Sequence, residues 1–100
     1  VHAMTRAMAV DCAPHGVRVV SVSPGSVRTP LLEWGAAQQA GPEGSAEAVI
    51  AEWGRTHPIG RVGEAEEVAA LIAWACSDEA GFVTGTDLRI DGGLLARLAV

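Results

Sequence analysis

The sequence of 100 residues contains no tyrosine, no lysine and no Gly-x-Gly-x-x-Gly motif. Its positive charge comes from seven arginines that are scattered along the chain, and twelve acidic residues bring the net charge to −5. Because phosphate backbones are bound by clustered cations, we expect no nucleic acid partner. No apolar run approaches the roughly 18 residues that cross a bilayer, so we expect no membrane partner either.

Cysteine is scarce as well. Cys12 and Cys76 are far apart in sequence, and each lies in an apolar pattern of helical spacing. Free cysteine is usually buried, so we expect two buried free thiols in a cytoplasmic protein, with a disulfide left open as the alternative. The chain has no Cys-x-x-Cys pattern and no histidine cluster, and we therefore expect no metal site.

The residues that are present are typical of a folded α/β protein. Val1–Ala13 predicts an amphipathic helix, and no residue that could cap it precedes Val1, which indicates a fragment. Val17–Ser23 predicts a buried strand that is apolar on both faces, as in parallel sheets covered by helices. The predicted buried face of the helix consists of Val1, Met4, Met8 and Cys12.

The rest of the chain predicts further helices, a strand and one irregular stretch. Residues 30–57 have low regularity and large apolar groups, which predicts a mobile flap that contains one short helix, Ser45–Trp53, with Ser45 as its N-cap. Glu64–Cys76 is the clearest amphipathic helix, with a cluster of glutamates in its solvated first turn. Thr86–Ile90 predicts the last strand, and Asp91-Gly92-Gly93 closes it.

The segment after the valine-rich strand is the candidate binding site. It reads Pro24-Gly25-Ser26-Val27-Arg28-Thr29. Proline stops the strand, and glycine lets the backbone approach a ligand closely. Because ligands of open α/β sheets bind beyond the carboxyl ends of the strands, we expect a backbone amide near Val27 and the Thr29 hydroxyl to hold an amide or phosphate group. An ordinary strand-ending turn is the alternative.

Further signals follow this segment in order: Gly60-Arg61-Val62-Gly63 with Glu64-Ala65-Glu66-Glu67, then Ser77-Asp78-Glu79, Thr84-Gly85 and Ile90-Asp91-Gly92-Gly93. Together they resemble the C-terminal part of the short-chain dehydrogenase/reductase family. The resemblance implies an α/β fold, namely the C-terminal portion of a Rossmann-type doubly wound parallel sheet. Residues 1–100 would form the C-terminal part of a single NAD(P)-binding domain, with residues 30–57 as its substrate-binding loop.

The same resemblance implies an oxidoreductase that uses NAD or NADP and transfers hydride between the nicotinamide and a carbonyl or alcohol substrate. The positions that would hold the nicotinamide end are Pro24, Gly25, Val27 and Thr29. The candidate substrate contacts, whose apolar character indicates a hydrophobic substrate, are Leu31, Leu32, Trp34 and Trp53; the two tryptophans serve equally well to pin the flap to the body. Residues 64–76 and 86–93 would form subunit contacts of a homotetramer.

No catalytic residue is assigned to this chain. Val1–Ala13 resembles the end of the helix that carries the family's catalytic Tyr-x-x-x-Lys pair, and the serine, tyrosine and lysine themselves are missing, so we expect the 100 residues alone to be inactive. Val20 and Ala65 depart from residues common in the family. We expect His2, His15 and His57 to be solvated or locally bonded and not part of a hydrolase triad. The alternative function is a non-catalytic remnant that acts as a binding or assembly module.

Overall fold

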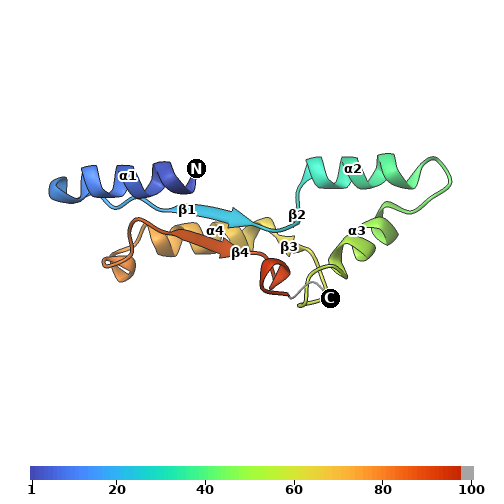
Figure 1. Cartoon of the computed structure of the whole chain (residues 1–100). Coiled ribbons are helices and arrows are strands. Elements are labelled where there is room, and N and C mark those ends of the chain that lie inside the picture. Colours follow the sequence, from blue (N-terminus) through green and yellow to red (C-terminus); the bar gives the residue numbers. More distant parts are fainter. Residues whose placement is uncertain (98–100) are drawn as a thin grey trace. The chain divides into compact units, whose positions relative to one another are not determined.

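The computed structural model describes residues 1–97, which divide into two compact units. Unit 1 comprises Val1–Ser23 and Ala69–Arg89, and unit 2 comprises Pro24–Val68 and the residues from Ile90 onward. Each unit therefore combines two stretches of chain that are distant in sequence. The elements themselves are a mixture of helices and short strands (Figure 1).

Unit 1 contains the first helix and most of a parallel strand pair. Helix α1 (His2–Cys12) passes into a short 3-10 helix that ends at Gly16, whose φ of 74° lies in the left-handed region that glycine adopts most easily. Strand β1 (Ser21–Pro24) pairs with β4 (Asp87–Ile90). The Ser21 N–H donates to Thr86 O at 3.1 Å, and the two arrows run in the same direction in Figure 1. The predicted helix and both predicted strands are thus present.

The valine-rich strand is shorter and less covered than predicted. Regular strand begins at Ser21, although Gly85 N–H already donates to Val19 O at 2.8 Å. Val17 is exposed and the strand residues from Ser21 to Ser23 are half-buried, so the expected burial on both faces is absent from the described residues. The sheet of residues 1–97 that contains β1 has two strands, and a place for β1 inside a wider sheet stays a prediction.

The predicted buried face of α1 is wrong. Met4 and Met8 are 58% and 45% exposed, whereas the buried residues of the helix are Thr5 and Ala9. The reason is that α1 lies close to the backbone at Gly85: a Cβ added at Gly85 would lie 3.4 Å from the Ala9 Cβ. Only small side chains fit where a helix meets backbone at this distance, so size and not apolar spacing selects the packed face.

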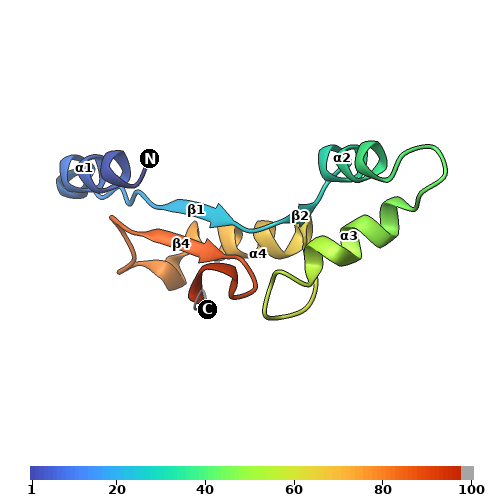
Figure 2. The ribbon, with the colours of Figure 1, turned by 45° about the vertical axis from the view of Figure 1, so that its right-hand side comes forward.

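Unit 2 contains a second parallel pair and a helical hairpin. Strand β2 (Val27–Arg28) pairs in parallel with β3 (Gly63–Glu64). Helices α2 (Pro30–Ala40) and α3 (Ala46–Gly54) pack against each other, as Figure 1 and Figure 2 both show. Their core is formed by Ala36, Ile50 and Val62, against which pack Leu32, Ala46, Val49 and Trp53.

The expectation of an irregular flap in residues 30–57 is therefore wrong, while the short helix predicted within it is confirmed. Two hydroxyl caps explain the regular structure: Thr29 Oγ1 accepts the Leu32 N–H, and Ser45 Oγ accepts the Ala48 N–H, both at 3.2 Å. Each cap satisfies an amide that a helix start otherwise leaves unpaired. The sequence interpretation used Thr29 as a ligand contact and missed the helix that it begins.

Helix α4 (Ala65–Ala75) confirms the clearest predicted helix and is anchored at both ends. At its start the Glu64 N–H donates to Glu67 Oε1 at 3.0 Å. Beyond its end, Arg18 donates to Ala75 O at 2.8 Å and to Ser77 O at 3.1 Å, which places a cation at the negative end of the helix.

Cys12 and Cys76 are both free, as expected, but Cys12 is half-buried and Cys76 is exposed, so their predicted burial is wrong. Among the described residues, no helix combines the length and the apolar character that crossing a membrane requires.

Candidate functional site

Gly25 and Ser26, which follow β1 and form its exit, are held by several contacts within unit 2. The Gly25 N–H donates to Ile90 O at 3.0 Å. A Cβ added at Gly25 would lie 3.0 Å from the Asp91 Cα and 3.0 Å from His57 Nε2, closer than ordinary contacts of a side-chain carbon. Glycine is therefore required here because a larger residue would collide with Asp91 and His57. This reason is independent of the predicted approach of a ligand.

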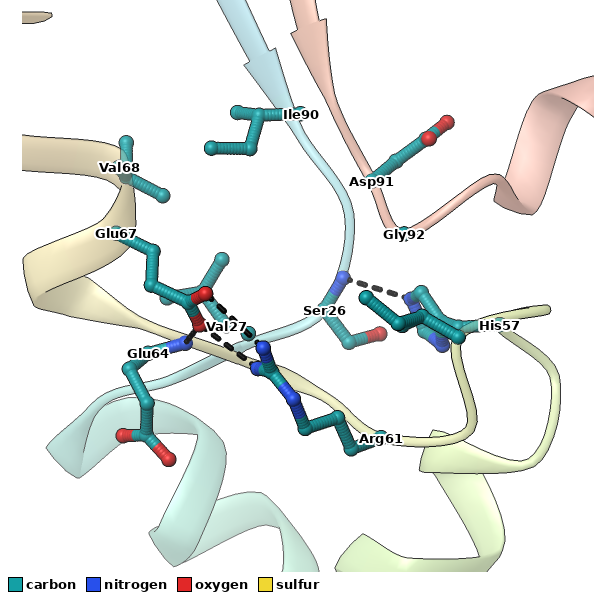
Figure 3. A pocket seen from close by; sticks show the side chains of 12 residues that line it. Ser26, Val27, His57, Arg61, Glu64, Glu67, Val68, Ile90, Asp91 and Gly92 are labelled. Atoms are coloured by element: carbon teal, nitrogen blue, oxygen red, sulfur yellow. Dashed lines mark hydrogen bonds and ion pairs between the residues drawn. The ribbon is translucent and has the colours of Figure 1, made fainter. Parts of the chain in front are cut away.

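Both backbone polar groups of Ser26, the N–H and the carbonyl, are hydrogen-bonded. Its N–H donates to His57 Nε2 at 3.2 Å (Figure 3), and its carbonyl accepts the Gly63 N–H at 2.8 Å. Val27 follows directly in β2, opposite Gly63. The backbone that the sequence assigned to cofactor binding is thus a rigid strand-to-strand connection.

Thr29 lies at the end of this connection, half-buried, as the N-cap of α2. Capping uses its oxygen as an acceptor for the Leu32 N–H. A hydroxyl in this arrangement can still donate its hydrogen to an acceptor on a ligand. The four predicted cofactor contacts therefore lie in one continuous stretch, and their contact with a cofactor stays a prediction.

His57 is the residue whose importance the sequence did not indicate. It is 3% exposed, and both ring nitrogens have partners: Nε2 accepts the Ser26 N–H, and Nδ1 lies 3.1 Å from Trp53 O. The expectation of a local bond is confirmed, whereas the bond to Ser26 spans 31 residues. A histidine between a helix end and a proline gives no sequence signal that would separate this role from a solvated one.

Beside Ser26 and His57 lies a cavity of about 120 Å³ with a mixed polar and apolar lining (Figure 3). The Arg61 guanidinium crosses it and binds the Glu67 carboxylate at 2.7 Å and 3.0 Å. This hydrogen bond from Arg61, together with that from the Glu64 N–H, lowers the pKa of Glu67 to about 2. The positive charge in the cavity is therefore already neutralised. Its lining consists of Ser26, Val27, His57, Ile59, Arg61, Gly63, Glu64, Glu67, Val68, Ile90, Asp91 and Gly92.

The structure separates the four predicted substrate contacts into two pairs. Leu32 and Trp53 pack against the core of the α2–α3 hairpin. Leu31 and Trp34 are 76% and 62% exposed on α2. Leu32 and Trp53 thus have a packing role in the hairpin, whereas Leu31 and Trp34 form exposed apolar surface. Substrate contact by any of the four stays a prediction.

A second polar cluster in unit 1 brings histidine, serine and aspartate together. Ser21 Oγ and Ser23 Oγ donate to the same Asp87 Oδ1 at 2.7 Å and 2.8 Å, and these bonds lower the pKa of Asp87. His2 Nε2 lies 3.2 Å from that oxygen and 3.4 Å from Ser23 Oγ. A catalytic triad needs histidine between serine and aspartate, through opposite ring nitrogens. Here both hydroxyls are bound by the carboxylate directly, so no serine is activated.

Among residues 1–97, no group of three or more histidine, cysteine, aspartate or glutamate side chains is placed to hold a metal ion. In the predicted cofactor segment the Gly25 and Ser26 N–H groups already donate to Ile90 O and His57 Nε2. The Thr29 hydroxyl can still donate to a ligand, and its use by a nicotinamide cofactor stays a prediction.

The comparisons with known proteins agree on one family. Residues 1–95 match the family model described as enoyl-(acyl carrier protein) reductase. The 3beta-hydroxysteroid dehydrogenase 1 of Eggerthella lenta is 40% identical over 91 residues, which are 91% of this chain and 32% of that protein. The chain thus spans about a third of the length of this curated relative.

Two solved structures have the same local fold. The aldohexose dehydrogenase of Thermoplasma acidophilum superposes with a TM-score of 0.90 at 39% identity, over 99% of this chain and 39% of that one. A short chain dehydrogenase family protein from Francisella tularensis superposes with a TM-score of 0.90 at 31% identity, over 96% of this chain and 40% of that one. With the family model matching nearly every residue and these structures superposing on the same helices and Rossmann-type strands, this chain belongs to the short-chain dehydrogenase/reductase family.

Proposed function

We propose that the full-length protein is an NAD(P)-dependent dehydrogenase/reductase in which this chain supplies part of the nicotinamide pocket. Membership of the family supports the class of reaction, which is hydride transfer between a nicotinamide and a carbonyl or alcohol substrate. When bound, the cofactor supplies the hydride donor or acceptor, and the protein binds and orients it. The cofactor is NAD or NADP.

The observation that carries this proposal is the fixed exit of β1. Backbone bonds to Ile90 and Gly63 and the ring of His57 hold residues 25 and 26 at the carboxyl end of a parallel strand. Ligands of open α/β sheets bind beyond such ends, and a preorganised backbone orients a flat ring without paying for its own ordering. The Thr29 hydroxyl lies at the end of the same segment and can donate to a carboxamide oxygen or a phosphate.

The experiment is a titration of the full-length protein with NADH and with NADPH, followed by nicotinamide fluorescence. Thr29→Ala removes one ligand hydrogen bond and should raise the dissociation constant about fivefold. Thr29→Ser keeps the hydroxyl and should bind as the wild type does. Because Thr29→Ala also removes the α2 cap, Ser45→Ala is the matched control.

Ser45→Ala removes the equivalent cap of α3, whose geometry is the same, and should lower the stability by about 1 kcal/mol with no change in cofactor affinity. Equal affinities of the Thr29→Ala variant and the wild type would exclude the hydroxyl from the site. A wild-type protein that changes the fluorescence of neither nucleotide would refute the proposed function itself.

The substrate and the assembly are finer parts of the proposal. Exposed Leu31 and Trp34 support a hydrophobic carbonyl or alcohol substrate that reaches the site past α2. For assembly, exposed Ile72 and Trp74 on α4 support a homo-oligomer formed through residues 64–76 and 86–93. A cytoplasmic location stays a prediction. Measurement of the molecular mass in solution tests the assembly.

A further inference from the structure

We propose that His57 is a positioning residue that holds the backbone at Ser26 in place for the cofactor, and that it does so only as a neutral imidazole. The proposal rests on the proposed function, because the segment that His57 holds is the one assigned to the nicotinamide. It assigns a role to a side chain that lies 31 residues from this segment in sequence.

The hydrogen bonds determine which nitrogen carries the proton. The Ser26 backbone N–H can only donate, so His57 Nε2, 3.2 Å away, must accept and must be unprotonated. The proton of the neutral ring therefore lies on Nδ1, which faces Trp53 O at 3.1 Å and Thr56 Oγ1 at 3.2 Å. Thr56 Oγ1 itself donates to Trp53 O at 2.7 Å, which leaves its lone pairs free to accept from Nδ1.

The surroundings of the ring hold it in this one position. The side chain is 3% exposed, and its Nε2 lies where a Cβ on Gly25 would contact it at 3.0 Å. The ring thus fills the space beside Gly25 and cannot turn away without opening a gap next to the strand exit. Through Nδ1 it ties the same exit to the last turn of α3, so the α2–α3 hairpin and the segment from Gly25 to Val27 are joined by one side chain.

Four charged side chains line the same cavity as the ring. Asp91, on the segment after β4, uses its two carboxylate oxygens for the Gly93 and Leu95 N–H groups, and its carboxylate points away from His57 in Figure 3. From the loop before β3, Arg61 is paired with Glu67 of α4. Glu64, at the end of β3, is the remaining charged side chain that lines the cavity.

Protonation of His57 would break the connection. A proton on Nε2 would face the Ser26 N–H at hydrogen-bond distance, donor against donor, and the ring would have to move. Ser26 N–H would lose its acceptor, and the connection from Pro24 to Val27 would lose one of its fixed points. We therefore expect cofactor affinity to fall as the pH decreases through the range in which histidine gains its proton, between about pH 8 and about pH 6.

Two substitutions separate the acceptor from the rest of the side chain. In His57→Gln the amide oxygen reaches the place of Nε2 and accepts without titrating. In His57→Asn the shorter amide reaches only the place of Nδ1 and leaves Ser26 without its acceptor. His15→Gln is the control, because His15 is exposed at the end of the 3-10 helix after α1.

The measurement is the dissociation constant of NADH and NADPH for the full-length protein at both pH values, by nicotinamide fluorescence. The wild type and His15→Gln should lose about fivefold in affinity at the lower pH. His57→Gln should bind almost as tightly as the wild type at the higher pH and lose the pH dependence. His57→Asn should bind about fivefold more weakly at both pH values. Thermal unfolding of each variant reports whether it is folded.

Failure of this inference is distinct from failure of the proposed function. A wild type that binds neither nucleotide refutes both. A wild type that binds equally at both pH values, or two folded His57 variants with the same affinity and the same pH profile as the wild type, refutes the role of His57 alone. Should both variants fail to fold, ¹⁵N NMR of the wild-type imidazole decides: a proton on Nε2 of the neutral ring contradicts the proposal.

Discussion

At the scale of single residues, Gly25 and Thr29 each have a structural role within the protein in addition to their predicted role in cofactor binding. The residue types of Gly25 and Thr29 predict contact with a cofactor. In the structure Gly25 is required by its contacts with His57 and Asp91, and Thr29 caps a helix. Both roles are compatible with cofactor binding, because they fix the position from which backbone and hydroxyl groups act.

The residue-scale prediction compares two glycines that differ in the space around them and in their secondary structure. Gly25→Ala places a Cβ 3.0 Å from Asp91 backbone and from His57 Nε2, and should destabilise the full-length protein by about 1–3 kcal/mol. Gly35 lies within α2, and a Cβ there would meet only the Trp53 ring at 3.9 Å, an ordinary contact. Gly35→Ala should therefore stabilise by up to about 1 kcal/mol, because alanine is the better helix former.

Chemical unfolding of both variants measures these free energies. Equal effects of the two substitutions would mean that the crowding at Gly25 is relieved at no cost. The sequence could indicate Gly25 because it stands beside a proline at a strand end. It could not indicate His57, because burial of a histidine depends on which distant segment folds against it, here the one from Gly25 to Ser26.

At the scale of elements, the sequence was informative wherever an element shows amphipathic spacing and a cap. Both are present in α3, and α4 has the spacing together with an acidic first turn; their predicted ranges agree with Ala46–Gly54 and Ala65–Ala75 within a few residues. In α2 the apolar residues surround the helix, with Leu31 and Trp34 outward and Leu32 inward, so no stripe marks one face. Its cap, Thr29, also suits a ligand contact. The sequence therefore predicts an irregular flap where the structure has a helix.

The element-scale prediction is that the α2–α3 hairpin is stabilised by its own small core. Ile50 is 4% exposed between Ala36 and Val62, and Ile50→Ala should destabilise the protein by about 2–5 kcal/mol through lost burial and a cavity. Leu31→Ala, at a side chain that is 76% exposed on the same hairpin, should change the free energy of unfolding by no more than about 0.5 kcal/mol.

Hydrogen exchange of the α2 and α3 amides locates the effect. Faster exchange confined to these two helices in Ile50→Ala supports a hairpin core of its own. A variant in which exchange is as slow as in the wild type, or in which Leu31→Ala accelerates it equally, contradicts the assignment of Ile50 to that core.

At the scale of the whole molecule, the apolar residues of the described chain are distributed unlike those of a complete domain. The buried apolar residues are small for the most part: Ala9, Ala36, Ile50, Val62, Ala75 and Ala80. The large apolar residues that are exposed are Val1, Met4, Met8, Val10, Val17, Leu31, Trp34, Ile59, Ile72, Trp74, Phe82 and Leu95. Fold class and order of elements were predictable because they follow local patterns, whereas burial was not, because it depends on which surfaces meet.

The last prediction concerns these 100 residues as an isolated polypeptide. Burial of a large apolar side chain contributes about 1.5–3 kcal/mol, and the described residues obtain this gain at few positions while each ordered residue costs about 1–2 kcal/mol of backbone entropy. The isolated polypeptide should therefore aggregate or remain poorly folded, with no cooperative thermal transition by circular dichroism. Co-expression with the remaining part of a full-length relative, such as the Eggerthella lenta enzyme that this chain matches at 40% identity, should increase its solubility. A soluble monomer that unfolds cooperatively without such a partner would instead support the autonomous binding or assembly module, because its core would then suffice without additional sheet and helix surface.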